Sequence, residues 1–278
     1  MKNESILVLG TVRNCEKTIV SDIFKLKKEL RSFKKIHFLV CESDSSDNTL
    51  CNLFYLKNKV DNFDYISLGN LRFKIQKRTE RIAYCRQTLI NQIKLKKLYK
   101  IFKYTLISDL DGIIQDLSKK GIMTSFSPRA PEWAAVCANQ DGPYFDIFAL
   151  RKKGWIEYNC VKKYEDYLKG SKLNKRYISY KTMLSHMIKI KKNNNWIEVD
   201  SAFGGTAIYK TKYLLNKKYV GYDFKNRTEI CEHVSLNNQI RLEGGKIFIN
   251  PNFINTKVVR YTKNLNVRKF FYKLSYFL

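Results

Sequence analysis

Apolar and polar positions alternate between strand-like and helix-like patterns through the first 110 residues. Short apolar runs that are typical of buried strands occur at residues 6–9, 36–41, 65–68 and 104–108. Apolar residues at helical spacing lie between them, at residues 16–31, 50–59 and 80–97. Strands that alternate with helices predict an α/β fold with a mostly parallel central sheet and helices on both faces.

Three of the predicted strands end in polar loops. The first is followed by TVRN at residues 11–14, the second by ESDSSD at 42–47, and the fourth by DLDG at 109–112. In open parallel sheets, ligands bind beyond the carboxyl ends of the strands. We therefore expect these three loops to form one binding site.

Beyond residue 133 the pattern is less regular. Short aromatic segments are followed by a lysine-rich stretch at residues 162–192, and then by the segments SAFGG, CEH and INP. No internal repeat and no linker rich in Pro, Gly or Ser divides the chain. We expect one domain over residues 1–262, followed by a basic-aromatic segment at 263–278.

The composition adds a strong positive charge to this picture. The 278 residues are 44% hydrophobic with only four prolines, which is typical of a packed globular protein. Lys and Arg number 52 against 25 Asp and Glu, so the formal charge is +27. Such a charge favours an anionic partner, namely nucleic acid, an acidic membrane surface or a phosphorylated substrate, although a solvated lysine-rich surface gives the same count.

The seven cysteines include no CxxC pair and no zinc-binding spacing. Because the chain is too large to need disulfide cross-links, we interpret them as reduced thiols in a cytosol. The N-terminal apolar run is too short for a secretory signal, and no other stretch is long enough to cross a bilayer. The predicted location is cytoplasmic.

The sharpest chemical signal is the pair Asp109 and Asp111 in DLDG. Two carboxylates at the mouth of a sheet can hold a divalent cation that neutralises a substrate diphosphate, and hard oxygen ligands suit Mg²⁺ or Mn²⁺. Aspartates that cap a helix or shape a turn give the same string. The metal interpretation therefore depends on neighbouring signals.

Arginines cluster between the two acidic loops. Arg78, Arg81 and Arg86 in RTERIAYCR fall at the start of a predicted helix, where guanidinium groups and the helix terminus both favour phosphate. A surface salt bridge with Glu80 is the alternative. We take Arg81 and Arg86 as candidate phosphate ligands.

Two further segments carry candidate site residues. In CEH, His233 can complete a metal shell and Glu232 can act as a base or orient an acceptor hydroxyl, although a Glu-His pair is often incidental. In SAFGG, Gly204 and Gly205 let backbone approach a ligand closely, and paired glycines also serve ordinary turns.

Together these segments resemble the glycosyltransferases related to the fungal cryptococcal capsular α-mannosyltransferases, a family with bacterial and viral members. The matching segments, in the order of that family, are VRNCEKTI at 12–19, ESDSSDNT at 42–49, RTERIAYCRQ at 78–87, DLDG at 109–112, YFDIFALR at 144–151, SAFGGTAIY at 201–209, CEHVSLN at 231–237 and INP at 249–251. They span most of residues 6–255.

The resemblance implies a GT-A fold, a nucleotide diphosphate-sugar donor and dependence on Mn²⁺ or Mg²⁺. The resemblance places Arg13, Glu42 and Asp44 near the nucleotide, Asp109 and Asp111 at the metal and diphosphate, and Glu232 and His233 on the far side of the site. It places Asp146, Arg151, Gly204 and Gly205 along the sugar and acceptor pocket. The full set of candidates therefore comprises Thr11, Arg13, Glu42, Asp44, Arg81, Arg86, Asp109, Gly204 and Gly205 for the donor, Asp109, Asp111 and His233 for the metal, and Glu232, Asp146 and Arg151 for catalysis. The fungal relatives are similar to retaining mannosyltransferases, which implies GDP-mannose. This sequence shows no amino-terminal anchor of the kind they carry, so their location and acceptor are not carried over.

The residues leave other functions open. A basic nucleic-acid-binding protein would explain the charge but not the acidic loops, and no zinc-finger spacing, RRM motif or basic zipper is present, so we expect no nucleic-acid partner. A metal-dependent nucleotidyl or phosphoryl transferase would use paired aspartates equally well, although no Walker A string occurs. An inverting glycosyltransferase would need a carboxylate behind the anomeric carbon, for which Glu232 and Asp146 are candidates.

The segment at 263–278 interleaves cations with aromatic residues. The cations Arg268, Lys269 and Lys273 suit anionic headgroups. Helical spacing places Phe270, Leu274, Phe277 and Leu278 on one side of a helix, with Phe271 off that side. Peripheral attachment to the cytosolic face of a membrane, near a lipid-linked acceptor, is one interpretation. A terminal helix packed on the protein's own core is the other.

Overall fold

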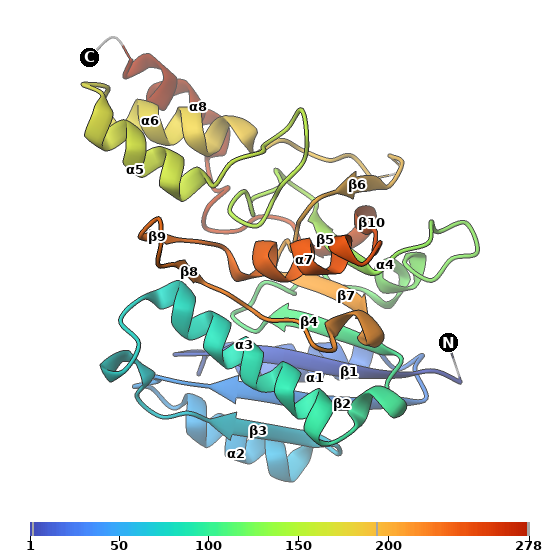
Figure 1. Cartoon of the computed structure of the whole chain (residues 1–278). Helices are drawn as coiled ribbons and strands as arrows, with labels where there is room; N and C mark the ends of the chain where they lie inside the picture. The colour runs from blue at the N-terminus through green and yellow to red at the C-terminus, as the bar shows by residue number, and fades with distance from the viewer. Residues whose placement is uncertain (2, 193, 277–278) are drawn as a thin grey trace.

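The computed structural model describes residues 1, 3–192 and 194–276. Its centre is an eight-stranded sheet with the order β3-β2-β1-β4-β7-β5-β10-β6 (Figure 1). The strands are β1 (Ser5–Val12), β2 (Lys35–Glu42), β3 (Phe63–Ser67), β4 (Tyr104–Asp109), β5 (Ala135–Gln140), β6 (Ile197–Val199), β7 (Thr206–Lys210) and β10 (Ile247–Thr256). Strands β1 to β4 run parallel, as do β5 and β10, whereas β7 and β6 run antiparallel to their neighbours. The predicted mostly parallel α/β sheet is confirmed.

Helices cover both faces of this sheet. They are α1 (Ile19–Glu29), α2 (Thr49–Lys59), α3 (Arg78–Leu95), α4 (Lys119–Thr124), α5 (Cys160–Gly170), α6 (Lys175–Thr182), α7 (Glu232–Leu242) and α8 (Leu265–Leu274). A short two-stranded ribbon of β8 (Tyr222–Asp223) and β9 (Thr228–Glu229) precedes α7. Helices α5, α6 and α8 form a group at the end of the molecule farthest from α2 and β3 (Figure 1).

Alternate residues of the central strands serve two hydrophobic cores, because successive side chains of a strand point to opposite faces of a sheet. Leu7 and Leu9 of β1 join the core that contains residues of α3 and α7. Ile6 and Val8 join the core that contains residues of α1, α2 and α4. The buried strands thus hold the carboxyl ends of β1, β2 and β4 side by side at one edge.

The first helix is shorter than its apolar spacing predicts and begins at Ile19 rather than near residue 16. The residues before Ile19 form hydrogen bonds with the segment that follows β2. The backbone N–H of Cys15 donates to Thr49 Oγ1 at 2.7 Å, and that of Glu16 donates to Asp47 Oδ2 at 3.1 Å. These bonds join the TVRN and ESDSSD loops, as their positions after neighbouring strands predict.

The C-terminal helix α8 packs against α6 and is neither wholly exposed nor wholly buried. Leu265 is buried, whereas Phe270 and Phe271 are each 61% exposed. Phe271, which helical spacing sets off the side of Phe270 and Leu274, faces solvent as they do. Phe277 and Leu278 lie outside the described residues. Within the residues that the structure describes, no helix is long and apolar enough to span a bilayer.

Candidate functional site

A cavity of about 550 Å³ opens at the carboxyl ends of β1, β2 and β4. The starts of α3 and α7 and the loop after β5 complete its wall. The sequence-predicted site residues that line this cavity are Thr11, Arg13, Asp44, Arg81, Arg86, Asp109, Asp111, Asp146, Glu232 and His233. Residues that are more than 200 positions apart in the chain therefore meet at one place.

Asp109 is the last residue of β4, and Asp111 follows it on the loop. A buried carboxylate holds this loop in place, because Asp22 on α1 accepts the backbone N–H of Gly112 at 2.9 Å. Desolvation in the cavity and the neighbouring Asp109 raise the pKa of Asp111 to about 6. Two acidic groups that repel each other in this way are typical of a site that binds a cation.

Arg86 lies between two carboxylates of the cavity. Its Nη2 donates to Asp109 Oδ1 at 2.8 Å, and its Nε lies 3.0 Å from Glu232 Oε1. Its guanidinium also stacks over the Phe203 ring at 4.9 Å. Burial alone would lower the pKa of Arg86, but Glu232 and Asp109 hold it above its usual value. Arg86, predicted from sequence as a phosphate ligand, is thus engaged with two carboxylates of the protein.

Glu232 and His233 are the first two residues of α7, and both line the cavity. Burial raises the pKa of Glu232, and Arg86 opposes that shift. The His233 ring stacks on Phe203 with 3.6 Å between ring centroids. Among the described residues, neither ring nitrogen of His233 has a hydrogen-bond partner. Burial and the nearby Arg86 lower the pKa of His233 well below its usual value, so the imidazole is neutral.

The burial of neutral His233 predicts a pH effect on stability in the absence of divalent metal. The unfolded chain takes up a proton below a pH of about 6.5, whereas the folded chain does not. Stability is therefore lost as the pH falls through that value. Relative to wild type, His233→Phe should gain about 1.4 kcal/mol for each pH unit below 6.5. Urea unfolding of both proteins at several pH values measures this difference, and a constant difference would contradict it.

The loop after β2 is held by an ion pair. Asp44 has a positive φ of 60° and a side chain that is 1% exposed, and its Oδ2 lies 3.5 Å from Nε of Arg81. Arg81 also donates to the backbone carbonyls of Ile75 and Gln76, both at 2.8 Å. Both side chains line the cavity, and their contact joins the loop after β2 to the first turn of α3.

Four of the sequence-predicted residues do not line the cavity but hold its loops. Glu42 accepts the N–H of Ser45 at 2.9 Å and thereby shapes the loop after β2. Arg151 donates to the carbonyls of Phe148 and Leu150. The remaining two, Gly204 and Gly205, have φ values of 69° and 82°.

The two glycines connect the cavity carboxylates through the backbone. The N–H of Gly204 donates to Asp146 Oδ2 at 2.9 Å, and the carbonyl of Gly205 accepts the N–H of Asp109 at 2.9 Å. Asp146 also accepts the N–H of Ala149, and burial raises its pKa to about 6. The SAFGG turn therefore positions Asp109 and Asp146.

Gly204→Ala should destabilise the fold by at least about 2 kcal/mol. Its φ is left-handed, and an added Cβ would lie 2.5 Å from the carbonyl oxygen of Ala138. Gly244→Ala is the matched control, because Gly244 has a φ of 77° with nothing within 4 Å of an added Cβ. Thermal or urea unfolding of both variants measures the contribution of the clash. Equal losses in the two variants would show that Gly204 needs only its backbone angle.

The cavity also contains residues that were not predicted from the sequence. Arg78 lines it with an exposed side chain at the start of α3, and its place in the RTER cluster was the available signal. Phe145, Phe148 and Tyr261 form an aromatic side, on which Phe145 and Tyr261 stack with centroids 6.2 Å apart. Tyr261 follows β10 in a stretch with no motif, so nothing in the sequence indicates its position.

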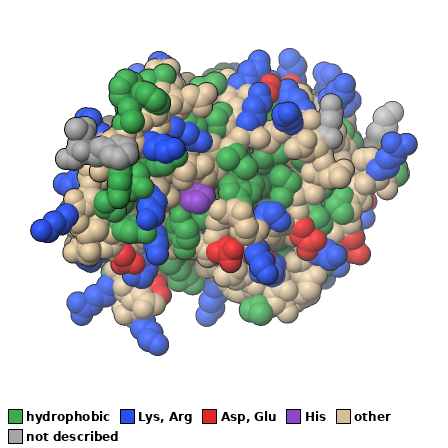
Figure 2. All heavy atoms as spheres, turned by 90° about the horizontal axis from the view of Figure 1, so that it is seen from above, with side chains coloured by type: hydrophobic (Ala, Val, Ile, Leu, Met, Phe, Trp, Pro, Cys, Tyr) green, Lys and Arg blue, Asp and Glu red, His purple; other side chains and the backbone are tan. Residues whose placement is uncertain are grey.

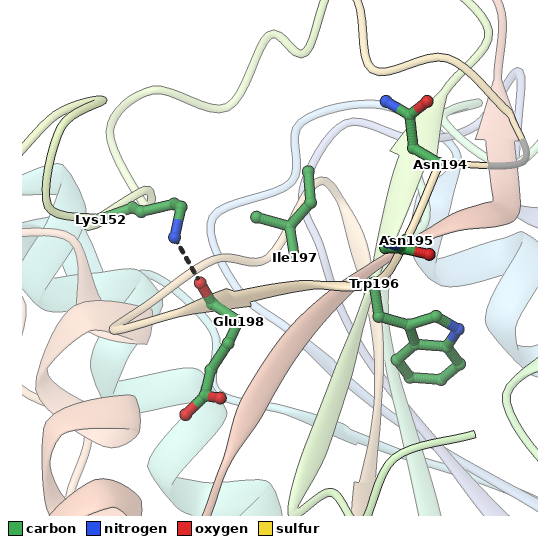
Figure 3. A pocket seen from close by; sticks show the side chains of 6 residues that line it. All are labelled: Lys152, Asn194, Asn195, Trp196, Ile197 and Glu198. Carbon is green, nitrogen blue, oxygen red and sulfur yellow. Dashed lines mark hydrogen bonds between the residues drawn. The ribbon is translucent and has the colours of Figure 1, made fainter. Parts of the chain in front are cut away.

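A second cavity, of about 580 Å³, lies at the β6 edge of the sheet. Its lining residues are Lys152, Asn194, Asn195, Trp196, Ile197 and Glu198 (Figure 3). Lys152 Nζ donates to the backbone carbonyl of Glu198 at 2.9 Å, as Figure 3 shows. Among the described residues its lining has no arginine and one carboxylate, that of Glu198, so the cavity at the strand ends is the candidate site.

Comparison with known proteins identifies a fold. No protein-family model and no curated protein matches the chain. Among solved structures, the mannosyltransferase PcManGT from Pyrobaculum calidifontis, in complex with GDP-Man and Mn²⁺, matches 99% of this chain with 12% identity and a TM-score of 0.50. The match spans 63% of that protein, so this chain covers less than two thirds of its length.

Two further solved structures are similar at a lower level. TarS from S. aureus matches 98% of this chain and 70% of its own, with 11% identity and a TM-score of 0.47. Glucosyl-3-phosphoglycerate synthase from Mycobacterium tuberculosis matches 98% of this chain and 78% of its own, with 9% identity and a TM-score of 0.47. The likeness to PcManGT confirms the GT-A type of α/β fold that was predicted from the sequence.

Proposed function

We propose that this protein is a metal-dependent glycosyltransferase that moves a sugar from a nucleotide diphosphate-sugar to a glycan acceptor. One observation carries the proposal: Asp109 and Asp111 share a strand-end cavity with the exposed side chains of Arg13 and Arg78. Carboxylates for a cation and arginines for phosphate together suit a diphosphate bound with a divalent metal. The motif order that resembles the cryptococcal capsular mannosyltransferase family supports the same activity.

Asp109, Asp111 and His233 would hold Mn²⁺ or Mg²⁺ in this proposal. The fit rests on His233, whose buried ring nitrogens lack hydrogen-bond partners among the described residues and whose neutral form is the one that binds metals. No three His, Cys, Asp or Glu side chains within the described ranges form a metal-binding group by themselves. Phosphate oxygens of the donor and water would therefore complete the shell. A bound cation would neutralise the charge that develops on the leaving nucleoside diphosphate.

The chain's own residues would orient the donor and the acceptor. Arg13 and Arg78 would bind phosphate oxygens, since Arg81 and Arg86 already contact carboxylates of the protein. In a retaining transfer Glu232 would orient the acceptor hydroxyl, and in the alternative inverting reaction it would accept the proton of that hydroxyl. It is the better candidate than Asp146, whose two oxygens both accept backbone N–H groups.

For the donor, we propose GDP-mannose and a retaining transfer. The family resemblance supports this choice, and PcManGT was solved with GDP-Man and Mn²⁺.

For the location, we propose the cytosol, with peripheral contact to a membrane that carries the acceptor. In the described chain all seven cysteines are free, which suits a reducing compartment.

Donor hydrolysis measured against UDP-, GDP- and CMP-sugars with Mn²⁺ tests the function. We expect turnover of one sugar donor, with GDP-mannose first, and loss of that turnover when the metal is chelated. Turnover of nucleoside triphosphates without any sugar donor would instead indicate a phosphoryl or nucleotidyl transferase. Tight binding of single-stranded nucleic acid without any turnover would indicate the non-enzymatic alternative.

A further inference from the structure

Helices α6 and α8 carry an apolar and basic surface. Its exposed apolar residues are not among those that line the strand-end cavity. On α8, Val267, Phe270, Phe271 and Leu274 are between 44% and 61% exposed. The rings of Phe270 and Phe271 contact each other edge to face, with centroids 5.5 Å apart. Four neighbouring apolar side chains that face solvent on one short helix are typical of an interaction surface.

The two segments that form this surface carry cations and no carboxylate. Residues 171–192 and 257–276 contain no Asp or Glu. Their cations on and beside α6 and α8 are Lys172, Lys175, Arg176, Lys181, Arg260, Lys263, Arg268, Lys269 and Lys273. The two segments form one face, because α8 packs on α6 and the rings of Tyr177 and Tyr276 lie 4.8 Å apart. Figure 2 shows a face of the molecule on which apolar side chains lie among Lys and Arg side chains.

Two cations of α8 also hold the rim of the strand-end cavity. Arg268 Nη1 donates to the carbonyl of Tyr261 at 2.9 Å, and Lys269 Nζ donates to the carbonyl of Met187 at 2.7 Å. Tyr261 and Met187 both line the cavity. A binding partner that contacts α8 would therefore lie close to the strand-end cavity.

We propose that this α6–α8 surface docks on an anionic lipid bilayer and that the acceptor reaches the cavity from that bilayer, as a lipid-linked glycan. Exposed aromatic and aliphatic side chains enter the headgroup region, while surrounding lysines and arginines contact anionic headgroups. The apolar side of α8, with the cations of residues 171–192 and 257–276 around it, is complementary to such a membrane. The docking itself stands on the surface alone, whereas the delivery of the acceptor rests on the proposed glycosyltransferase activity.

Co-sedimentation of the full chain with vesicles tests the docking. Wild-type protein should sediment with phosphatidylcholine vesicles that contain about 30% phosphatidylglycerol, should bind pure phosphatidylcholine far less, and should be released by high salt. The double variant Phe270→Ser with Phe271→Ser, and separately Lys273→Glu, should each weaken binding at least about tenfold. These side chains are exposed, so thermal unfolding should match that of wild type.

Phe54→Ser is the matched control, because Phe54 is 63% exposed on α2, at the opposite end of the molecule. It should leave vesicle binding unchanged. Absence of wild-type binding to the anionic vesicles, or equal losses in Phe54→Ser and the α8 variants, would overturn the docking. Self-association that the α8 variants abolish, without vesicle binding, would assign the surface to a second copy instead and would also overturn it.

Donor hydrolysis separates this proposal from the proposed function. The α8 variants should hydrolyse the donor at the wild-type rate in solution, since none of their substitutions lies in the cavity wall. Transfer to a vesicle-embedded polyprenyl-diphosphate glycan should fall with vesicle binding, and unchanged transfer would overturn delivery from the bilayer. Vesicle binding without any donor turnover would remove the enzymatic function and leave the docking surface standing.

Discussion

Asp111→Asn should lower metal-supported turnover about a thousandfold, which corresponds to about 4 kcal/mol of transition-state stabilisation. Asp111 is the more exposed carboxylate of the DLDG loop, and the neighbouring Asp109 is paired with Arg86. The amide removes one negative charge and weakens the hold on the cation. Because the amide also removes the repulsion between Asp111 and Asp109, the free energy of unfolding measured in urea should not fall. Asp109→Asn should have a similar effect on turnover.

Asp116→Asn is the matched control for this experiment. Asp116 follows the same strand but lies outside the cavity lining, and its Oδ2 accepts the backbone N–H of Lys257 at 2.9 Å. It should retain turnover and its dependence on Mn²⁺. Near-normal turnover in Asp111→Asn would show that the metal assignment to DLDG is wrong.

Arg86→Gln should have the second-largest effect, on stability and turnover together. Arg86 is the cation that contacts both Asp109 and Glu232, and its side chain and that of Glu232 are 6% and 8% exposed. Removal of the guanidinium leaves the buried Glu232 carboxylate without its positive partner, which costs about 3–5 kcal/mol of unfolding free energy. We also expect a weaker apparent affinity for Mn²⁺, since Asp109 loses the contact that orients it. Urea unfolding and a Mn²⁺ titration of donor hydrolysis measure the two effects.

Two variants distinguish the positioning role of Arg86 from a merely structural one. The double variant Arg86→Leu with Glu232→Leu should recover most of the stability but no turnover, because both buried charges are gone. Arg241→Gln breaks a half-exposed pair with Asp200, whose atoms lie 2.6 Å apart, and should cost less than about 1 kcal/mol. Recovery of turnover in the double variant would contradict the role of both residues in the site.

The first half of the fold was predictable because its signals are local. Buried parallel strands such as β1 and β2 require continuous apolar runs, and the helices between them require apolar residues at helical spacing, so both leave clear periodicities. The second half was less predictable. Strands β6, β8 and β9 are two or three residues long, which is too short for any period to register. The antiparallel insertion of β7 between β4 and β5 also depends on contacts distant in sequence.

The candidate site divides in the same way. The DLDG, ESDSSD and TVRN loops could be placed together from the sequence, because the carboxyl ends of neighbouring parallel strands must share an edge. The role of each arginine could not be predicted from the sequence. Arg81 and Arg86 look equivalent to Arg78 in RTERIAYCR, yet Arg86 is buried against two carboxylates while Arg78 faces the cavity.

By itself, therefore, the sequence determined the α/β class, the strand-end position of the site and the strong positive charge, since these depend on periodicity, chain order and composition. Only the tertiary structure decided which charges meet. The pairing of Arg86 with Asp109 and Glu232 joins α3, β4 and α7, and the aromatic side of the cavity depends on Tyr261. Ion pairs and ring contacts act over a few ångströms between residues far apart in the chain, so no local pattern encodes them.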